Sequence, residues 1–259
     1  MTDTAEAKVD PTAHRDTVAS GRLVALTFDF WGTLYQNAYA REDRLARLDE
    51  ALRRHGEHRS RERIEAAYGH ARGVWDEVWR EERRSMPITR WLSELLGHLD
   101  ATIPDESAVR LGRAIEESFL RGDEPRPVPG VTDVVPRLAG EYRMGLISDT
   151  GLTPGRVLRR VMERDGLLAY FDVLTFSDEL GTAKPNAEPF LHTLERLDAD
   201  PEEAAHIGDL PETDLRGARD AGMKAVLFLG VSHREDGRGM ADAVFEDYSH
   251  LEHLLKHEV

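Results

Sequence analysis

The chain has 259 residues, no cysteine and a formal net charge of −15, with 40% hydrophobic and 32% charged residues. This length can hold one large domain or two smaller ones, and the missing cysteines exclude disulfides, thiolate catalysis and cysteine-based zinc sites. No apolar run reaches the roughly 18 residues of a membrane-spanning helix, and an acidic surface repels nucleic acid and anionic membranes, so we expect neither as a partner.

The N-terminal residues 1–22 are polar and lack apolar periodicity, so we expect them to be disordered and not to form a secretion signal. We therefore expect a cytoplasmic protein, either a monomer or a homodimer.

The first predicted element is a strand at residues 23–28, which ends at Asp29 and a Gly-Thr turn. Ligands bind at this edge of open α/β sheets, where a carboxylate can act as nucleophile or metal ligand. Alone, such an Asp could equally be only a turn-forming residue.

A helical segment follows, from residue 37 to about residue 126, in which apolar residues recur at spacings of three and four. It ends in a proline-rich hinge at residues 125–130. These patterns predict a helical bundle inserted after the first strand. Four aromatic residues of this segment could line a substrate pocket, although such residues more often form a bundle core. They are Tyr39, Tyr68, Trp75 and Trp79.

After the hinge, predicted strands alternate with predicted helices, which indicates a parallel sheet with helices on both faces. The expected strands are 144–147, 171–176, 206–207 and 225–229, and the expected helices are 154–164, 188–197, 214–221 and 248–257. The predicted fold class is therefore α/β, a doubly wound parallel sheet with a Rossmann-like core and an inserted all-helical domain. The eleven histidines show no two-histidine metal spacing, and we interpret them as surface or core residues.

Four segments at the predicted strand ends resemble, in order, the motifs of the haloacid dehalogenase-like hydrolase superfamily. They are residues 28–34, 148–150, 184–185 and 208–214. The resemblance covers residue 23 to the C-terminus and is closest to the subgroup with a helical cap. It implies an α/β core domain of residues 23–36 and 127–259, and a mobile cap domain of residues 37–126 over the active site.

The resemblance also implies a mechanism in which Asp29 attacks phosphorus to form an aspartyl-phosphate that water hydrolyses. A carboxylate can approach a dianionic phosphate when Mg²⁺ bridges the two anions, and Mg²⁺ prefers oxygen ligands. The expected metal ligands are Asp29, Asp209, the Trp31 carbonyl and, directly or through a water, Asp214. For Asp209 and Asp214 the alternative is a helix N-cap with a first-turn acid.

Phosphate is expected to bind to Gly32, Thr33, Ser148, Asp149 and Lys184, of which Ser148 and Lys184 also count as catalytic. Ser148 offers a hydroxyl and nearby backbone N–H groups, and Lys184 offers a point charge. Each has an ordinary alternative. Ser148 would then be a plain strand-end residue, Asp149 would cap the following turn, and Lys184 would be a solvated loop lysine.

Trp31 departs from the phosphatase pattern of the superfamily, which has a second Asp two residues after the nucleophile. That Asp protonates the leaving group, a role worth about 10²–10⁴-fold that indole cannot fill. Haloacid dehalogenases of the superfamily carry an aromatic Tyr there, but they place Ser and Asn, and no metal, where this chain has Asp209 and Asp214. We therefore predict a Mg²⁺-dependent phosphohydrolase for a small phosphorylated metabolite. The alternatives are a 2-haloacid dehalogenase and a catalytically weak phosphate-binding relative.

Overall fold

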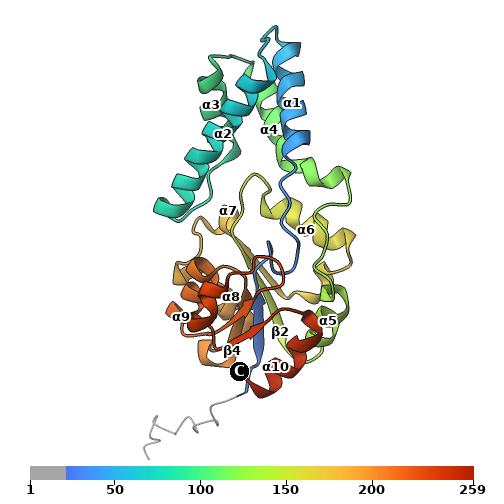
Figure 1. Cartoon of the computed structure of the whole chain (residues 1–259), viewed down its shortest axis with the longest axis vertical. Coiled ribbons are helices and arrows are strands. Elements are labelled where there is room, and N and C mark those ends of the chain that lie inside the picture. Colours follow the sequence, from blue (N-terminus) through green and yellow to red (C-terminus); the bar gives the residue numbers. More distant parts are fainter. Residues whose placement is uncertain (1–21) are drawn as a thin grey trace, which may run out of the picture.

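The computed structural model describes residues 22–259, and the prediction for residues 1–22 therefore lies outside the described residues except at Arg22. One six-stranded sheet forms the centre of the molecule, in the order β3-β2-β1-β4-β5-β6, with every neighbouring pair parallel (Figure 1). The strands are β1 (Ala25–Phe28), β2 (Arg143–Ser148), β3 (Val173–Phe176), β4 (Ala204–Gly208), β5 (Lys224–Phe228) and β6 (Ala243–Phe245).

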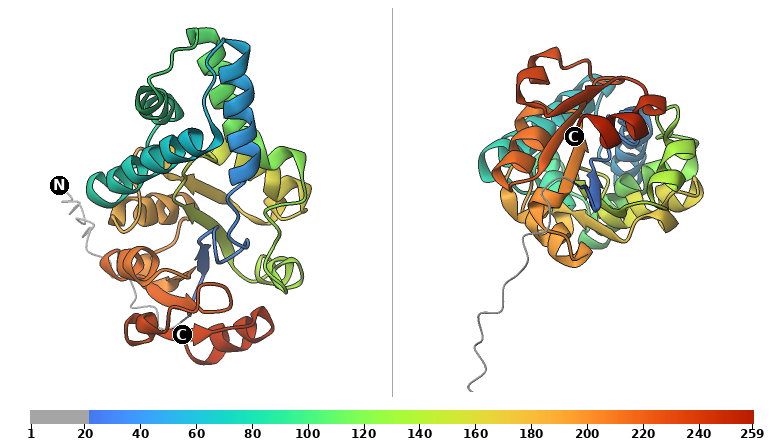
Figure 2. Two further views of the ribbon diagram at one scale, coloured as in Figure 1. Left: turned by 45° about the horizontal axis from the view of Figure 1, so that its top comes forward. Right: turned by 90° about the horizontal axis from the view of Figure 1, so that it is seen from below.

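Helices cover both faces of this sheet, as the predicted doubly wound α/β class requires. The main helices of the core are α5 (Val131–Leu138), α6 (Gly155–Arg164), α8 (Ala187–Leu197), α9 (Arg216–Asp220) and α10 (Leu251–His257). Apolar side chains of α5, α6 and α10 belong to one buried cluster with the sheet. Those of α8 and α9 belong to a second cluster on the other face. Figure 2 shows this layering from two further sides.

The polypeptide between β1 and β2 forms a separate helical insertion, which we define as residues 37–126. Its elements are α1 (Arg41–Arg54), α2 (Arg61–Glu77), η1 (Val78–Glu82), α3 (Ile88–Leu99), α4 (Asp105–Glu116) and η2 (Glu117–Arg121). The stripe Leu45, Leu48 and Leu52 is buried and packs with Trp91 in a cluster of its own. The insertion lies above the sheet in Figure 1.

The order of the strands explains where a ligand can bind. Strand β1 lies between β2 and β4, and the chain proceeds to β3 on one side and to β5 and β6 on the other. Such a point of reversal leaves a crevice at the carboxyl ends of the strands. Phe28 is in register with Leu146 and Ile207, so the residues that follow these three strands meet at one edge, which faces the helical insertion.

Strand β6 and helix α5 are among the elements that the sequence did not predict, as is the one-turn helix α7 (Ser177–Leu180). Strand β6 has only three residues, which is too short to show an alternating pattern. Helix α5 has eight residues and contains Pro136, which as a rule interrupts helices. The predicted helix at 214–221 is instead the turn η5 (Pro211–Leu215) followed by α9.

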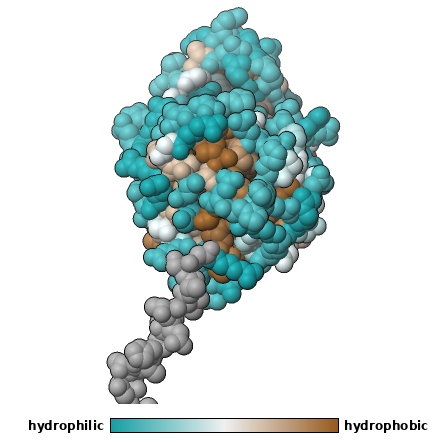
Figure 3. Space-filling model, turned by 60° about the horizontal axis from the view of Figure 1, so that its bottom comes forward, coloured by the Kyte–Doolittle hydropathy of each residue, from teal (hydrophilic) through white to brown (hydrophobic). Residues whose placement is uncertain are grey.

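The exterior agrees with the acidic composition. The end of the molecule away from the insertion is largely hydrophilic, with apolar residues gathered through its middle (Figure 3). Within residues 22–259, none of the helices has the length and apolar character that crossing a membrane demands.

Candidate active site

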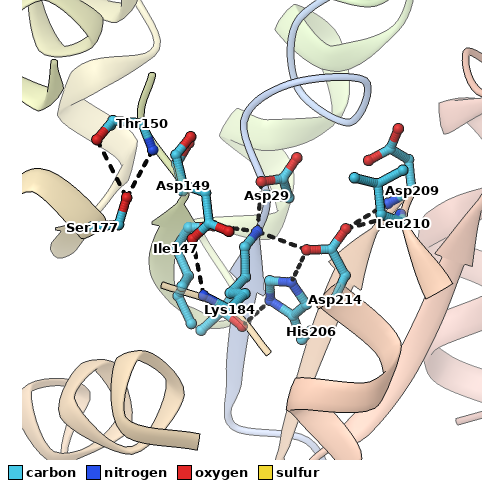
Figure 4. Close-up of polar contacts among 12 residues, drawn as sticks. Asp29, Ile147, Asp149, Thr150, Ser177, Lys184, His206, Asp209, Leu210 and Asp214 are labelled. Atoms are coloured by element: carbon cyan, nitrogen blue, oxygen red, sulfur yellow. Dashed lines mark hydrogen bonds and ion pairs between the residues drawn. The ribbon is translucent and has the colours of Figure 1, made fainter. Parts of the chain in front are cut away.

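Four segments that are distant in sequence bring acidic and basic side chains to the carboxyl edge of the sheet (Figure 4). The backbone N–H of Asp29 donates to the Ile207 carbonyl at 2.9 Å, which fixes Asp29 at the tip of the central strand. Three of the other members follow β2, β3 and β4, and the last lies within η5. They are Asp149, Lys184, Asp209 and Asp214.

Lys184 lies at the centre of this cluster, and only 2% of it is exposed. Its Nζ donates to Asp29 Oδ1 at 2.6 Å, to Asp214 Oδ1 at 2.6 Å and to the Ile147 carbonyl at 3.0 Å. Burial opposes the ammonium charge, but Asp214, Asp29 and Asp149 outweigh it and raise the pKa of Lys184 above its ordinary value. Lys184 is therefore a charged group of the site and not a solvated loop residue.

Asp214 organises the loop after β4. Its Oδ2 accepts the backbone N–H groups of Asp209 at 3.1 Å and Leu210 at 2.9 Å. Burial works against ionisation, yet Lys184 and His206 hold the pKa of Asp214 well below its usual range. The N-cap of η5 (Pro211–Leu215) is Leu210, so the N-cap alternative is wrong for Asp209. Asp214 does lie in the first turn of η5, but its carboxylate contacts the site.

Asp209 carries a buried oxygen that accepts no hydrogen bond from the described residues. This oxygen is Oδ1, whereas Ser232 Oγ donates to Oδ2. Burial, together with repulsion from Asp214, raises the pKa of Asp209 to about 7. Burial also raises the pKa of Asp29 well above its ordinary value, although Lys184 opposes the shift.

These three carboxylates fit a hard divalent cation. Asp29, Asp209 and Asp214 can each present an oxygen such that all three lie within 4.8 Å of one another, and Lys184 is the cation that contacts two of them. Buried like charges at this spacing repel unless a positive charge lies between them. An all-oxygen donor set with a free buried oxygen on Asp209 is what Mg²⁺ prefers.

The loop after β1 approaches Asp209 closely at Gly32. Gly32 has φ +74°, and a Cβ built there would lie 2.2 Å from Asp209 Oδ2. Thr33 Oγ1 is buried without a hydrogen-bond partner in the described structure. Trp31 is half-buried, and its ring packs 5.8 Å from that of Phe119 in the helical insertion. The predicted roles of Gly32, Thr33 and the Trp31 carbonyl in binding phosphate or metal stay predictions.

Ser148 and Asp149 follow β2 as expected, but they have different surroundings. The Ser148 hydroxyl is buried and contacts only the Asp149 carbonyl, at 3.4 Å. Asp149 Oδ1 accepts the backbone N–H of Lys184 at 3.0 Å, and its Oδ2 accepts Trp79 Nε1 at 2.8 Å. Asp149 therefore does not cap its own turn. It connects the loop that carries Lys184 to the helical insertion.

Three further residues complete the cluster: His206 and Ser232, which the sequence did not single out, and Trp79, which it offered only as a pocket or bundle-core aromatic. His206 is fully buried in β4, with Nε2 3.4 Å from Asp214 Oδ1 and Nδ1 2.8 Å from Thr27 Oγ1. A histidine in an otherwise apolar strand was its only available signal. Nothing indicated Ser232 or the contact of Trp79 with Asp149, because these contacts join segments that are far apart in the chain.

A cavity of about 400 Å³ lies between the helical insertion and the core. It reaches the cluster at Trp31 and Asp149, and Tyr39, Tyr68 and Trp75 form part of its wall. Three of the four aromatic residues that the sequence placed more readily in a bundle core therefore line a cavity. Trp79 stacks on Trp75 at 5.8 Å between ring centroids and contacts Asp149 instead.

Comparison with known proteins gives relatives that match part of the chain. Pyrimidine 5'-nucleotidase YjjG of Escherichia coli is 36% identical over 131 residues, which cover 50% of this chain and 56% of that protein. Glyceraldehyde 3-phosphate phosphatase of Methanothermobacter thermautotrophicus is 33% identical over 136 residues, with coverages of 50% and 59%. The matched part thus spans little more than half the length of these curated relatives.

Solved structures match over nearly the whole chain. The 2-haloacid dehalogenase of Pseudomonas syringae pv. Tomato has a TM-score of 0.67 at 27% identity, covering 90% of this chain and 98% of that one. The magnesium-bound hydrolase YfnB of Bacillus subtilis has a TM-score of 0.63 at 17% identity, with coverages of 91% and 99%, and shows the fold alone. A family model described as haloacid dehalogenase-like hydrolase matches residues 23–222, well over half of the chain. The chain therefore belongs to the haloacid dehalogenase-like hydrolases.

Proposed function

We propose that the protein is a Mg²⁺-dependent phosphohydrolase that acts on a small phosphorylated metabolite through an aspartyl-phosphate on Asp29. One observation carries the proposal: Asp29, Asp209 and Asp214 converge within 4.8 Å around a single buried lysine, Lys184. This set suits a metal and a phosphoryl group together. The phosphatase names of several relatives support it.

The roles of the residues follow from their contacts. Lys184 holds Asp29 Oδ1, which leaves Oδ2 to attack phosphorus while the bond to the leaving oxygen breaks. Water then attacks the phosphorus of the aspartyl-phosphate, which releases phosphate and restores Asp29. Ser148 Oγ would donate to a phosphoryl oxygen. Lys184 Nζ, whose three N–H groups contact Asp29, Ile147 and Asp214, would supply its positive charge beside the phosphoryl group. Mg²⁺, when bound, supplies the positive charge that lets the carboxylate approach the phosphate.

The leaving oxygen needs a proton, and Trp31 cannot provide one. Asp149 lines the cavity, but both of its oxygens already accept N–H groups, from Lys184 and Trp79. Burial raises the pKa of Asp149, while Lys184 and the N–H groups that it accepts oppose the shift. These N–H groups favour its carboxylate form, and we infer that it acts as an acceptor and not as the missing acid. We infer that the enzyme acts best on esters whose leaving group departs as a stable anion.

We further propose that the helical insertion is a cap over the core of residues 23–36 and 127–259. Three polar contacts beside the site support this role. Trp79 Nε1 donates to Asp149, the Ala183 N–H donates to the Arg83 carbonyl at 2.7 Å, and Ser85 Oγ donates to the Thr150 carbonyl at 2.8 Å. The cavity of about 400 Å³ between the insertion and the core favours small substrates over macromolecules.

Dehalogenation of a 2-haloacid is the second candidate, because Trp31 is aromatic and a 2-haloacid dehalogenase resembles the whole chain. The purified protein should be screened against phosphorylated metabolites and 2-chloropropionate, with Mg²⁺ and with EDTA. We expect phosphate release that requires Mg²⁺ and no chloride release. Chloride release in EDTA would favour the dehalogenase, and ligand binding without any turnover would favour a phosphate-binding relative.

A further inference from the structure

Arg44 is a buried cation whose charge has no acidic partner. It lies in the first turn of α1, exposes 6% of its surface and lines the cavity between the insertion and the core. None of the ion pairs among residues 22–259 includes it, and its neighbour Asp43 pairs with Arg47 at 2.7 Å. A buried arginine is usually paired, because burying an unpaired charge is costly.

The hydrogen bonds of Arg44 all go to neutral acceptors. They run to the Ile115 carbonyl at 3.4 Å, the Tyr39 carbonyl at 3.0 Å and Thr153 Oγ1 at 2.8 Å. A guanidinium has five N–H donors in a planar fork, and the Tyr68 side chain is a further hydrogen-bonding neighbour of Arg44, so one N–H is left for a ligand. The guanidinium also lies over the Phe119 ring, 5.6 Å from its centroid. The fork suits bidentate contact with a carboxylate or a phosphoryl group.

A second unused donor lies in the wall of the same cavity. Trp75 Nε1 is buried and has no acceptor among the described residues. Of the other arginines of the lining, Arg41 contacts Glu42 and Glu65, and Arg72 lies over the Tyr39 ring, much as Arg44 lies over that of Phe119. Arg44 differs from both in being buried. Arg44 and Trp75 therefore each offer an N–H donor to this cavity, whose walls are aromatic. These donors do not belong to the acidic cluster around Asp29, where the transferred phosphoryl group would bind.

We propose that Arg44 binds a second anionic group of the substrate, a carboxylate or a further phosphoryl group, and so selects phosphorylated molecules that carry two anionic groups. The aromatic walls would enclose the part of the molecule between them, and Trp75 Nε1 would donate to the same anion or to a neighbouring oxygen. This inference rests on the proposed phosphohydrolase function. It assigns Arg44 a role in specificity, not in the chemical step.

The test compares phenyl phosphate with 4-carboxyphenyl phosphate and 1,4-phenylene bisphosphate. We expect Arg44→Met to lower kcat/KM for the doubly anionic substrates about 10- to 100-fold more than for phenyl phosphate, the range of a hydrogen bond to a charged group. Comparing variant with wild type on each substrate cancels the differences in leaving-group pKa. Whichever of the two doubly anionic substrates loses more kcat/KM on Arg44→Met shows whether the second anion is a carboxylate or a phosphoryl group.

Three variants control for a purely structural role of Arg44. Arg44→Lys keeps the charge and should retain part of the preference. Arg47→Met removes a paired arginine of the same helix and should leave the preference unchanged. Thr153→Val removes the hydrogen bond that joins Arg44 to the core. If Arg44→Met and Thr153→Val both lower the activity on all three substrates equally, Arg44 only connects the insertion to the core, and the inference is wrong.

Binding measurements separate this inference from the proposed function. Calorimetry on Asp29→Asn with Mg²⁺ should show tighter binding of the two doubly anionic compounds, and adding Arg44→Met should abolish that difference. If wild type hydrolyses none of the three esters but this preference is present, the phosphohydrolase proposal fails and the role of Arg44 stands. If hydrolysis proceeds without a preference in either assay, the role of Arg44 alone fails.

Discussion

At the scale of single residues, Asp29 bears the proposed chemistry most directly. Asp29→Asn keeps a carbonyl oxygen that can accept from Lys184 Nζ but loses the negative charge that attacks phosphorus. We expect kcat to fall roughly 10⁴-fold or more, the scale on which enzymes lose rate without their nucleophile. The midpoint of thermal unfolding should stay close to wild type, because the change also removes one of three repelling carboxylates. Near-normal phosphate release from a folded variant would rule out Asp29 as nucleophile.

Trp31 is the residue that decides which leaving groups the enzyme tolerates. Without a general acid, log kcat/KM of the wild type should fall steeply as leaving-group pKa rises, so aryl phosphates should react far better than alkyl phosphates. Trp31→Asp should improve alkyl phosphates relative to aryl phosphates by up to about 10²-fold. Trp31→Phe preserves an aromatic contact with Phe119 and controls for altered packing. A flat dependence in the wild type would mean that another group supplies the proton.

At the scale of elements, the contact between the loop after β1 and the loop after β4 depends on Gly32. Gly32→Ala combines an unfavourable φ of +74° with a Cβ 2.2 Å from Asp209 Oδ2. We expect a loss of about 3 kcal/mol or more in the free energy of unfolding and weaker Mg²⁺ binding, measured by denaturant unfolding and calorimetry.

Gly56 provides a matched control for this prediction. Its φ is +75°, and a Cβ built there meets no atom within 4 Å. Gly56→Ala should therefore cost only the backbone strain, about 1–2 kcal/mol, and should leave Mg²⁺ binding unchanged. Equal costs for the two variants, with Mg²⁺ affinity unaltered in both, would show that the close approach of the loops does not matter.

At the scale of the whole molecule, a metal that binds only the folded state should stabilise it. Mg²⁺ at one hundred times its dissociation constant adds about 2.7 kcal/mol, which raises the midpoint of thermal unfolding by roughly 5–10 °C for a chain of this size. Asp209→Ala should abolish most of this rise, because it removes an expected ligand. Asp220→Ala, at an aspartate with 58% side-chain exposure in α9, should keep it. No rise in the wild type would exclude a Mg²⁺ site.

Local patterns in the sequence predicted most of the elements, though not β6 or α5, and the edge at which the site forms. Strands such as β1 and helices such as α1 follow from local hydrophobic periodicity, which the folded chain preserves because those residues form its core. Acidic residues placed directly after predicted strands, such as Asp29 and Asp209, must meet at one edge of a parallel sheet. The convergence of Asp29, Asp209 and Asp214 was therefore foreseeable.

The tertiary structure decided what each of these side chains contacts. Lys184 becomes a buried partner of two carboxylates, His206 lies against Asp214, and Trp91 belongs to the core of the insertion and also lines the cavity with Trp75. Arg44 resembles any helical arginine until the folded chain shows it buried and outside the ion pairs formed among residues 22–259. The spacing of apolar residues shows which face of an element is buried. The charges and the packing around one side chain depend instead on segments that are distant in sequence and meet only after folding.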